Sequence, residues 1–273
     1  MLSLRETVEK YGLMAQKALG QNFLLNPDIT DKIIRLSLSK QGLPNFSGFN
    51  LAEVGPGPGG LTRSAISENP DSLTVIEMDE RCIAIMEELR QNTGFDLRIV
   101  NGDAMLFDIA ANVPAPRQII SNLPYNISVP LLTGWLHQIK NFSALTLMFQ
   151  KEVAERIMAK TRCKDYGRLS VLAQLTCRIE KLFDLSPECF TPAPKIWSSV
   201  LLFRPLEQIP DTETLAKVEK LTAAAFSQRR KMLRQSLKAY PEVLQAFAAL
   251  QIAPTARAEE LTPQQFLKLA EFL

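Results

Sequence analysis

The hexapeptide Ser121-Asn122-Leu123-Pro124-Tyr125-Asn126 contains residue types suited to reaction at a purine amino group. Such an amine is a poor nucleophile, because its lone pair is delocalised into the ring. The side-chain carbonyl of Asn122 and a main-chain carbonyl near Leu123 or Pro124 can accept both of its hydrogens and orient the nitrogen. Tyr125 offers a face on which an extruded base can stack. The structural alternative is an Asn-Pro turn beside a core tyrosine.

A glycine-rich turn, Glu53-Val54-Gly55-Pro56-Gly57-Pro58-Gly59-Gly60, follows an apolar run and precedes a helical pattern. Glycine at such a strand end permits a sharp turn and a close approach to a ligand. Gly55, Gly57 and Gly60 also satisfy G-x-G-x-x-G, which alone permits a dinucleotide cofactor. A tight turn without any ligand is the alternative, but the two prolines add a rigidity that a simple turn does not need.

Two acidic residues stand at the ends of predicted strands: Glu77 ends the second strand, and Asp103 ends the third. Ligands of open α/β sheets bind outside the carboxyl ends of the strands, where Glu77 can accept ribose hydroxyls and Asp103 can meet a purine amino group. Carboxylates repel a pyrophosphate but suit a cationic sulfonium. The predicted cofactor is therefore S-adenosylmethionine, with S-adenosylhomocysteine as product, while solvated strand-end carboxylates are the alternative.

The elements that must position these residues follow an α/β rhythm. Short apolar runs, typical of strands, occupy residues 51–54, 73–77, 97–100, 118–121 and 144–149. Helical patterns lie between them at 61–69 and 80–90, so we expect a parallel sheet with helices on both faces. Segment 169–180 suits a helix or a strand, and segment 198–203 suits a terminal strand.

The pattern changes after Phe203, where prolines punctuate a polar stretch and strand-type alternation ends. Helical spacing follows at residues 215–226, 231–237, 242–250 and 263–272. The sequence thus predicts a cofactor-binding catalytic domain over residues 1–205 and a small all-α, RNA-binding domain over residues 206–273.

Composition limits the remaining classes of protein. The 273 residues are 46% hydrophobic and 22% charged, which excludes collagen-like and disordered chains. Four cysteines without close spacing and a single histidine make a metal site unexpected. Because the chain has neither a continuous apolar span nor a signal-peptide pattern, we expect a cytoplasmic protein without a membrane partner.

The net charge of +2 is too small to attract nucleic acid by itself, but basic residues cluster locally. One cluster lies in residues 226–238, a stretch that contains no acidic residue: Arg229, Arg230, Lys231, Arg234 and Lys238. A second set outnumbers its neighbouring acids: Lys151, Arg156, Lys160, Arg162, Lys164 and Arg168. On a helix, positions 230, 234 and 238 would share one face, which favours a phosphate-binding surface over a merely solvated one.

The ordered set of motifs resembles the small-subunit ribosomal RNA adenine dimethyltransferases, the KsgA (RsmA) group, from end to end. The matching pieces are GQNFL at 20–24, EVGPGPGG at 53–60, VIEMD at 75–79, GDA at 102–104, NLPYNIS at 122–128, QKEV at 150–153, YGRLS at 166–170, FTPAPK at 190–195 and segment 226–237. The resemblance implies a class I S-adenosylmethionine-dependent methyltransferase (Rossmann-like) sheet with an antiparallel last strand. It also implies four methyl transfers onto two adjacent adenines of the 3′-terminal hairpin of 16S rRNA.

Carried onto this sequence, the resemblance implies that Asn22 and Leu24 line the cofactor site and that Gly55 faces the methionine moiety. Asn122 would belong to both the cofactor and the substrate sites. Phe190 would form a second aromatic wall opposite Tyr125. The implied substrate is 16S rRNA in an immature small ribosomal subunit, and we expect the enzyme to act as a monomer.

The chain departs from the family pattern at Trp197, where aspartate is common, and at Gln235, where asparagine is usual. Neither position lies in the methyl-transfer motif. Three alternatives remain: an Erm-type enzyme acting on large-subunit rRNA, an RNA-binding assembly factor without catalysis, and a dinucleotide oxidoreductase. Leu123, where Erm-type enzymes commonly have isoleucine, favours the small-subunit enzyme.

Overall fold

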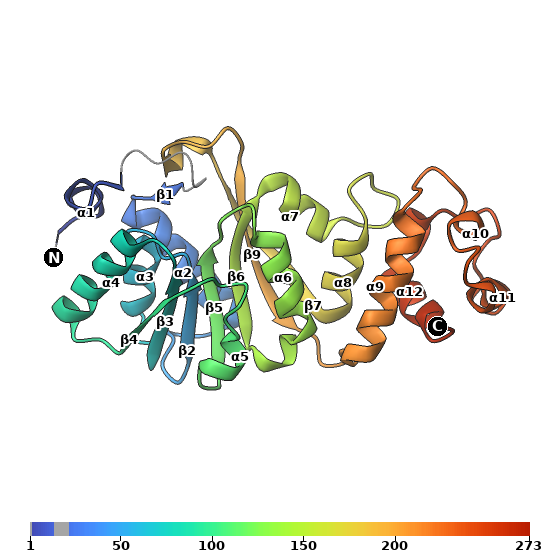
Figure 1. Cartoon of the computed structure of the whole chain (residues 1–273), viewed down its shortest axis with the longest axis horizontal. Coiled ribbons are helices and arrows are strands. Elements are labelled where there is room, and N and C mark those ends of the chain that lie inside the picture. The colour runs from blue at the N-terminus through green and yellow to red at the C-terminus, as the bar shows by residue number, and fades with distance from the viewer. Residues whose placement is uncertain (1, 14–21) are drawn as a thin grey trace. The chain divides into compact units, whose positions relative to one another are not determined.

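A seven-stranded, mostly parallel sheet organises the part of the chain described by the computed structural model, residues 2–13 and 22–273 (Figure 1). Its strands lie in the order β4 (Leu97–Asn101), β3 (Ser72–Glu77), β2 (Asn50–Val54), β5 (Arg117–Asn122), β6 (Ala144–Gln150), β9 (Ser198–Pro205) and β7 (Cys177–Leu185). Strands β2 to β6 pair in parallel, whereas β9 runs antiparallel to β6. β6 is buried at six consecutive residues, as expected for a parallel strand covered on both faces.

The order of the strands reverses between β2 and β5. From β2 the chain proceeds outward to β3 and β4, and it then returns to build β5 and β6 on the other side. Such a switch point leaves a crevice at the carboxyl ends of the strands. Glu77 at the end of β3 pairs in register with Asn101, and Asn122 ends β5 beside Met148 of β6.

Crossover helices place these strand ends. α3 (Gly60–Ile66) follows β2, and α4 (Glu80–Thr93) follows β3. α4 begins after Asp79, whose side chain accepts the N–H of Arg81 at 3.0 Å, and ends at Gly94 with a φ of +63°. Its buried face consists of Cys82, Ile85, Met86 and Leu89. The chain also forms α2 (Pro27–Gln41), α5 (Ile109–Asn112), α6 (Ser128–His137) and α7 (Lys151–Met158).

A short second sheet lies over the glycine-rich turn. After α1 (Leu4–Lys10), the strand β1 (Phe23–Leu24) pairs antiparallel with β8 (Phe190–Thr191). Phe23, Leu24 and Phe190 belong to the same buried cluster as the first strands of the large sheet. Two segments that are far apart in sequence are therefore held next to each other at the crevice.

The contacts divide the chain into two compact units. The first comprises Met1–Leu132, Lys140–Lys151 and Glu180–Arg204, and the second comprises Thr133–Ile139, Glu152–Ile179 and Pro205–Leu273. The second unit has its own apolar core, in which Tyr166 is fully buried and donates a hydrogen bond to the Leu261 carbonyl at 2.9 Å. Its helices include α8 (Arg168–Thr176), α9 (Thr212–Phe226), α10 (Leu233–Ser236), α11 (Pro241–Ala249) and α12 (Pro263–Ala270).

The five predicted strands and the helices between them are confirmed, with bounds that differ by one to three residues. Segment 169–180 contains both of its alternatives, because helix α8 passes directly into strand β7 at Cys177. The second compact unit also takes in residues 133–139 and 152–179, which the predicted boundary at 205 assigns to the catalytic domain. Of these residues, Ala159, Tyr166, Val171 and Leu175 belong to the buried cluster that forms the core of the C-terminal helices.

Candidate active site

The glycine-rich turn has a backbone that only glycine adopts readily. Gly55, Gly57 and Gly59 have φ angles of +67°, +54° and +84°. A Cβ on Gly57 would lie 2.9 Å from the ring of Phe23, and one on Gly60 would lie 2.6 Å from the carbonyl oxygen of Leu24. The missing side chains therefore let strand β1 rest directly against the turn.

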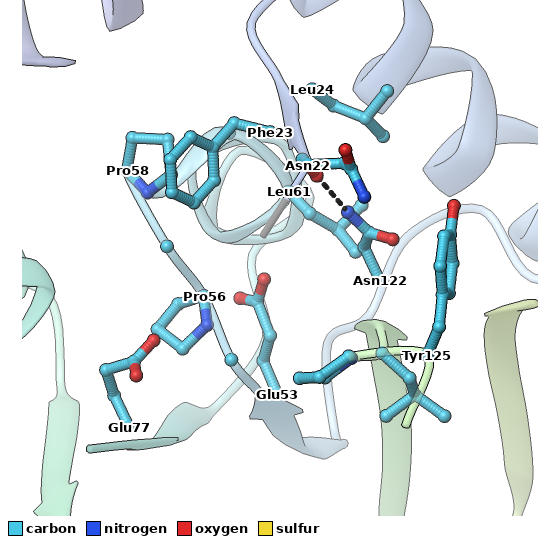
Figure 2. A pocket seen from close by; sticks show the side chains of 15 residues that line it. Asn22, Phe23, Leu24, Glu53, Pro56, Pro58, Leu61, Glu77, Asn122 and Tyr125 are labelled. Carbon is cyan, nitrogen blue, oxygen red and sulfur yellow. Dashed lines mark hydrogen bonds between the residues drawn. The ribbon is translucent and has the colours of Figure 1, made fainter. Parts of the chain in front are cut away.

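Asn122 is held at the end of β5 by a contact with the chain just before β1. Its side-chain nitrogen donates a hydrogen bond to the carbonyl oxygen of Asn22 at 3.2 Å (Figure 2). Its side-chain oxygen accepts no hydrogen bond from the described residues and lies on the side of Tyr125. This oxygen is thus an oriented acceptor that can serve a ligand.

Tyr125 lines the same pocket, and its hydroxyl lies 2.7 Å from the Oγ atom of Ser198 at the start of β9. Burial raises the pKa of the Tyr125 hydroxyl, although the hydrogen bond with Ser198 opposes this shift. The contact fixes the far end of the ring, and the pKa raised by burial keeps the hydroxyl neutral. The sequence carries no signal for Ser198, because the bond spans 73 positions of the chain.

Glu77 is 8% exposed, and backbone donors orient its carboxyl group. One of its oxygens accepts the N–H of Met78 at 2.8 Å and that of Asp79 at 3.0 Å. Burial raises the pKa of Glu77, and hydrogen bonds from these N–H groups and from Gly57 oppose the shift. Asp103 is partly exposed and accepts the N–H of Met105 at 2.8 Å. Both side chains thus have defined orientations.

Glu53 is a buried acid for which the sequence motif suggests no role. It is 3% exposed and accepts a hydrogen bond from the Thr62 hydroxyl at 2.7 Å. Burial raises its pKa to about 8, the Thr62 bond opposes this, and the charge of Glu77 adds to it. The sequence signal that could have identified Glu53 is its position as a charged residue inside the apolar run 51–54.

Replacing Glu53 with glutamine is expected to make the protein less sensitive to rising pH. The folded-state pKa of about 8 lies above the ordinary value of 4.5, so the folded protein holds a proton that the unfolded chain releases. Stability therefore falls as the pH rises from about 4.5 through about 8, by roughly 5 kcal/mol at most. Thermal unfolding at pH 6 and pH 9 should show a smaller difference for Glu53→Gln than for the unsubstituted protein. An equal difference would refute the proton assignment, and Glu155→Gln, at an exposed position, is the control.

Two adjoining hollows bring most of the predicted site residues together. The first is lined by Asn22, Leu24, Gly55, Gly57, Glu77, Asn122, Leu123, Pro124 and Tyr125, among others. The second contains Asp103, shares Gly55, Glu77 and Pro124 with the first, and has a volume of about 630 Å³. That volume is typical of a small-molecule site. Glu77, Asp103 and Asn122 supply oxygen acceptors that suit the hydroxyl and amino groups of an adenosine, and Arg81 also lines the second hollow.

Phe190 is placed differently from the pocket residues. Its side chain is 3% exposed, belongs to the core cluster and does not line either hollow. Leu24, its partner in the β1–β8 pair, does line the first hollow. The role of Phe190 as a second aromatic wall stays a prediction. Gly20 and Gln21 of the N-terminal motif lie outside the described residues.

The predicted helical face through positions 230, 234 and 238 is wrong. α9 ends at Phe226, and α10 covers only Leu233–Ser236, so neither Arg230 nor Lys238 lies in a helix. Met232 is extended, and the Leu233 N–H donates to the Ala256 carbonyl at 2.7 Å instead of continuing a helix. All five predicted RNA-binding residues are nevertheless exposed: Arg229, Arg230, Lys231, Arg234 and Lys238.

The sequence matches the family model described as ribosomal RNA adenine dimethylase over residues 12–273. The chain belongs to the ribosomal RNA adenine dimethylase family. Similar family members are named ribosomal RNA small subunit methyltransferase A. The one from Rhodospirillum rubrum is 43% identical over 267 residues, covering 98% of this chain and 91% of the relative. The one from Azorhizobium caulinodans is 44% identical over 272 residues, covering 98% and 91%.

Solved structures confirm the fold predicted for this adenine dimethylase family member. A dimethyladenosine transferase from Plasmodium falciparum matches with a TM-score of 0.72 and 25% identity, over 89% of this chain and 94% of that one. The 23S rRNA methyltransferase ErmE matches with a TM-score of 0.65 and 24% identity, over 92% and 99%. The chain has the α/β fold of class I methyltransferases.

The described residues of this family member form neither a cluster of metal-ligating side chains nor a membrane-spanning helix. They contain no group of three or more histidine, cysteine, aspartate or glutamate side chains arranged to hold a metal ion. None of their helices combines the length and apolar character needed to cross a membrane.

Proposed function

We propose that this chain transfers methyl groups from S-adenosylmethionine to two adjacent adenines in the 3′-terminal hairpin of 16S rRNA. The products are dimethyladenosines, formed during small-subunit ribosome biogenesis. The main support is the oriented side-chain oxygen of Asn122, which shares a pocket with Tyr125 at the switch point of the sheet. The family match and the names of the relatives agree with an rRNA substrate.

Different residues around the glycine-rich turn contact different parts of the cofactor. Glu77 accepts the ribose hydroxyls, and Asp103 meets the amino group of the adenine. Gly55 and Gly57 allow the backbone to approach the methionine part, while Asn22 and Leu24 close the pocket from the β1 side. When bound, S-adenosylmethionine supplies an electrophilic methyl carbon on a sulfur that departs as a neutral sulfide.

Alignment of the target amine is the main catalytic contribution of the protein. The Asn122 side-chain oxygen and a main-chain carbonyl at Leu123 or Pro124 accept the two amine hydrogens and point the nitrogen lone pair at the methyl carbon. Correct alignment can contribute about 7–11 kcal/mol. The same acceptors stabilise the positive charge that develops on the nitrogen. The methylated nitrogen then carries a positive charge and loses its proton to water, so no strong side-chain base is required.

The aromatic residues hold the extruded base. The ring of Tyr125 provides a stacking face whose position is fixed by the bond to Ser198. Phe190 would form the opposite wall, which requires its side chain to turn out of the core cluster when the base enters. We further propose a cytoplasmic, monomeric enzyme that acts without a metal on immature small subunits.

A labelling experiment tests this function. The protein is incubated with radiolabelled S-adenosylmethionine and small subunits from cells that lack the dimethyladenosines, and the modified nucleotides are mapped. We expect label at two adjacent adenines near the 3′ end of 16S rRNA. Label in 23S rRNA would support the Erm-type alternative. Binding without transfer would support the assembly-factor alternative.

Removing charge at Arg230 and Arg234 is expected to weaken RNA binding uniformly across sequences. Both side chains are exposed, and the short segment 226–238 contains no acid. If each neutralises one phosphate, the double alanine variant should reduce the slope of log K against log salt concentration by roughly two. Filter-binding titrations between low and physiological salt measure this slope. Lys268→Ala, an exposed lysine on α12, is the control, and an unchanged slope would remove these arginines from the interface.

A further inference from the structure

The loop 192–197, which connects β8 to β9, is anchored to the candidate site at both ends. On one side Thr191 pairs with Phe23, next to Asn22, in the short β1–β8 sheet. On the other side Ser198 contacts the hydroxyl of Tyr125 at 2.7 Å. The loop therefore belongs to the surroundings of the pocket, although its side chains do not line it.

The end of this loop exposes apolar surface. Trp197 is 49% exposed and Ile196 is 40% exposed, whereas the other tryptophan of the chain, Trp135, is only 4% exposed. An indole has a large flat face that stacks on nucleic-acid bases of any sequence. An exposed indole close to a site for an extruded base is thus suited to holding a neighbouring base.

One lysine lies beside this indole. The Nζ atom of Lys151 lies 5.5 Å from the centroid of the Trp197 ring, and the Lys151 backbone N–H donates to the Trp197 carbonyl at 2.9 Å. Lys151 and Lys181 both lie 3.2 Å from the same carboxylate oxygen of Asp184. Because one carboxylate faces two ammonium groups, the local charge is positive and complements a phosphate backbone.

We propose that Trp197 is a positioning residue that stacks on an unpaired RNA base next to the target adenine, with Lys151 facing the adjoining phosphate. This inference rests on the proposed function and specifies how the RNA strand is held outside the pocket. Aspartate, which is common in the family at this position, would offer neither a stacking face nor attraction to phosphate.

Steady-state methylation of immature small subunits tests the proposal with three variants. Trp197→Ala should raise KM for the subunit by roughly tenfold or more, the loss expected for one stacked base. Trp197→Phe should restore most of this loss, because phenylalanine keeps an aromatic face. Trp197→Leu should not, although it keeps apolar bulk. If the leucine variant equals the unsubstituted protein, the residue only packs within its loop and the proposal is wrong.

Tryptophan fluorescence gives a readout independent of catalysis. A single-stranded RNA oligonucleotide with the sequence of the 3′-terminal hairpin loop should quench the emission, because stacking on the exposed Trp197 is possible and contact with the buried Trp135 is not. The quenching should disappear in Trp197→Phe. Quenching that persists in this variant would overturn the proposal.

Two measurements separate failure of this inference from failure of the proposed function. Affinity for S-adenosylmethionine should be the same in all three variants, which also shows that they fold. If the unsubstituted protein methylates small subunits and Trp197→Ala has the same KM, only the role of Trp197 is refuted. If the unsubstituted protein does not methylate small subunits, the proposed function itself is refuted.

Discussion

Replacing Asn122 with alanine is expected to reduce the rate of adenine methylation by roughly 10²- to 10³-fold, the loss typical of removing one oriented catalytic group. The substitution removes the oxygen that accepts an amine hydrogen. It also removes the N–H that the Asn22 carbonyl accepts at 3.2 Å. The first loss lowers the rate of transfer, and the second releases the segment before β1, so cofactor affinity should fall as well.

Single-turnover methylation of immature small subunits at saturating cofactor measures the first effect, and equilibrium binding of S-adenosylmethionine measures the second. Asn141→Ala removes an exposed asparagine of the same compact unit and serves as the control. Normal dimethylation by Asn122→Ala would remove this residue from the catalytic role. Loss of cofactor binding without loss of the saturated rate would restrict Asn122 to the cofactor site.

Local sequence patterns predict the parts of the site that lie on strand ends. Glu77 and Asp103 follow apolar runs, and parallel strands bring their carboxyl ends to one edge, so their proximity follows from the strand assignment. The conformation of the glycine-rich turn follows in the same way, because Gly55 and Gly57 adopt positive φ angles. These features depend on neighbours in sequence and on a sheet topology with few alternatives.

Contacts between distant segments are not predictable from the same patterns. The bond between Asn122 and Asn22 spans 100 positions, and the one between Tyr125 and Ser198 spans 73. The first bond depends on where the short strand β1 pairs, and the second depends on where the terminal strand β9 pairs. The periodicity of residues along a strand does not predict which residues of another strand lie beside it. The burial of Phe190 has the same origin, since its pairing with Leu24 decides it.

The error in the segment 226–238 has a different physical cause. Leu233 and Leu237 have helical spacing, and both are fully buried. A single helical turn is enough to bury two leucines that lie four positions apart. Their burial therefore does not require the longer helix that would align Arg230 with Lys238. Because the Leu233 N–H donates to the Ala256 carbonyl, the helical turn begins only at Leu233, after Arg230.

Replacing Gly60 with alanine is expected to destabilise the protein and weaken cofactor binding, although alanine normally favours a helix. The new Cβ would lie 2.6 Å from the Leu24 carbonyl oxygen, a backbone atom that cannot rotate away. Strand β1 must therefore move, at a cost of about 1–3 kcal/mol for an overpacked contact. Its movement displaces Asn22, whose carbonyl orients Asn122.

Gly134→Ala in α6 is the matched control, for which we expect no loss of stability. A Cβ there meets no atom within 4 Å, so this variant should be unchanged or more stable by about 0.4–1 kcal/mol. Denaturant unfolding measures both stabilities, and calorimetric titration measures S-adenosylmethionine affinity, which we expect to fall at least tenfold in Gly60→Ala only. If both variants behave alike, the contact between β1 and the glycine-rich turn does not shape the cofactor site. A stability loss without an affinity loss would mean that β1 adjusts without moving Asn122.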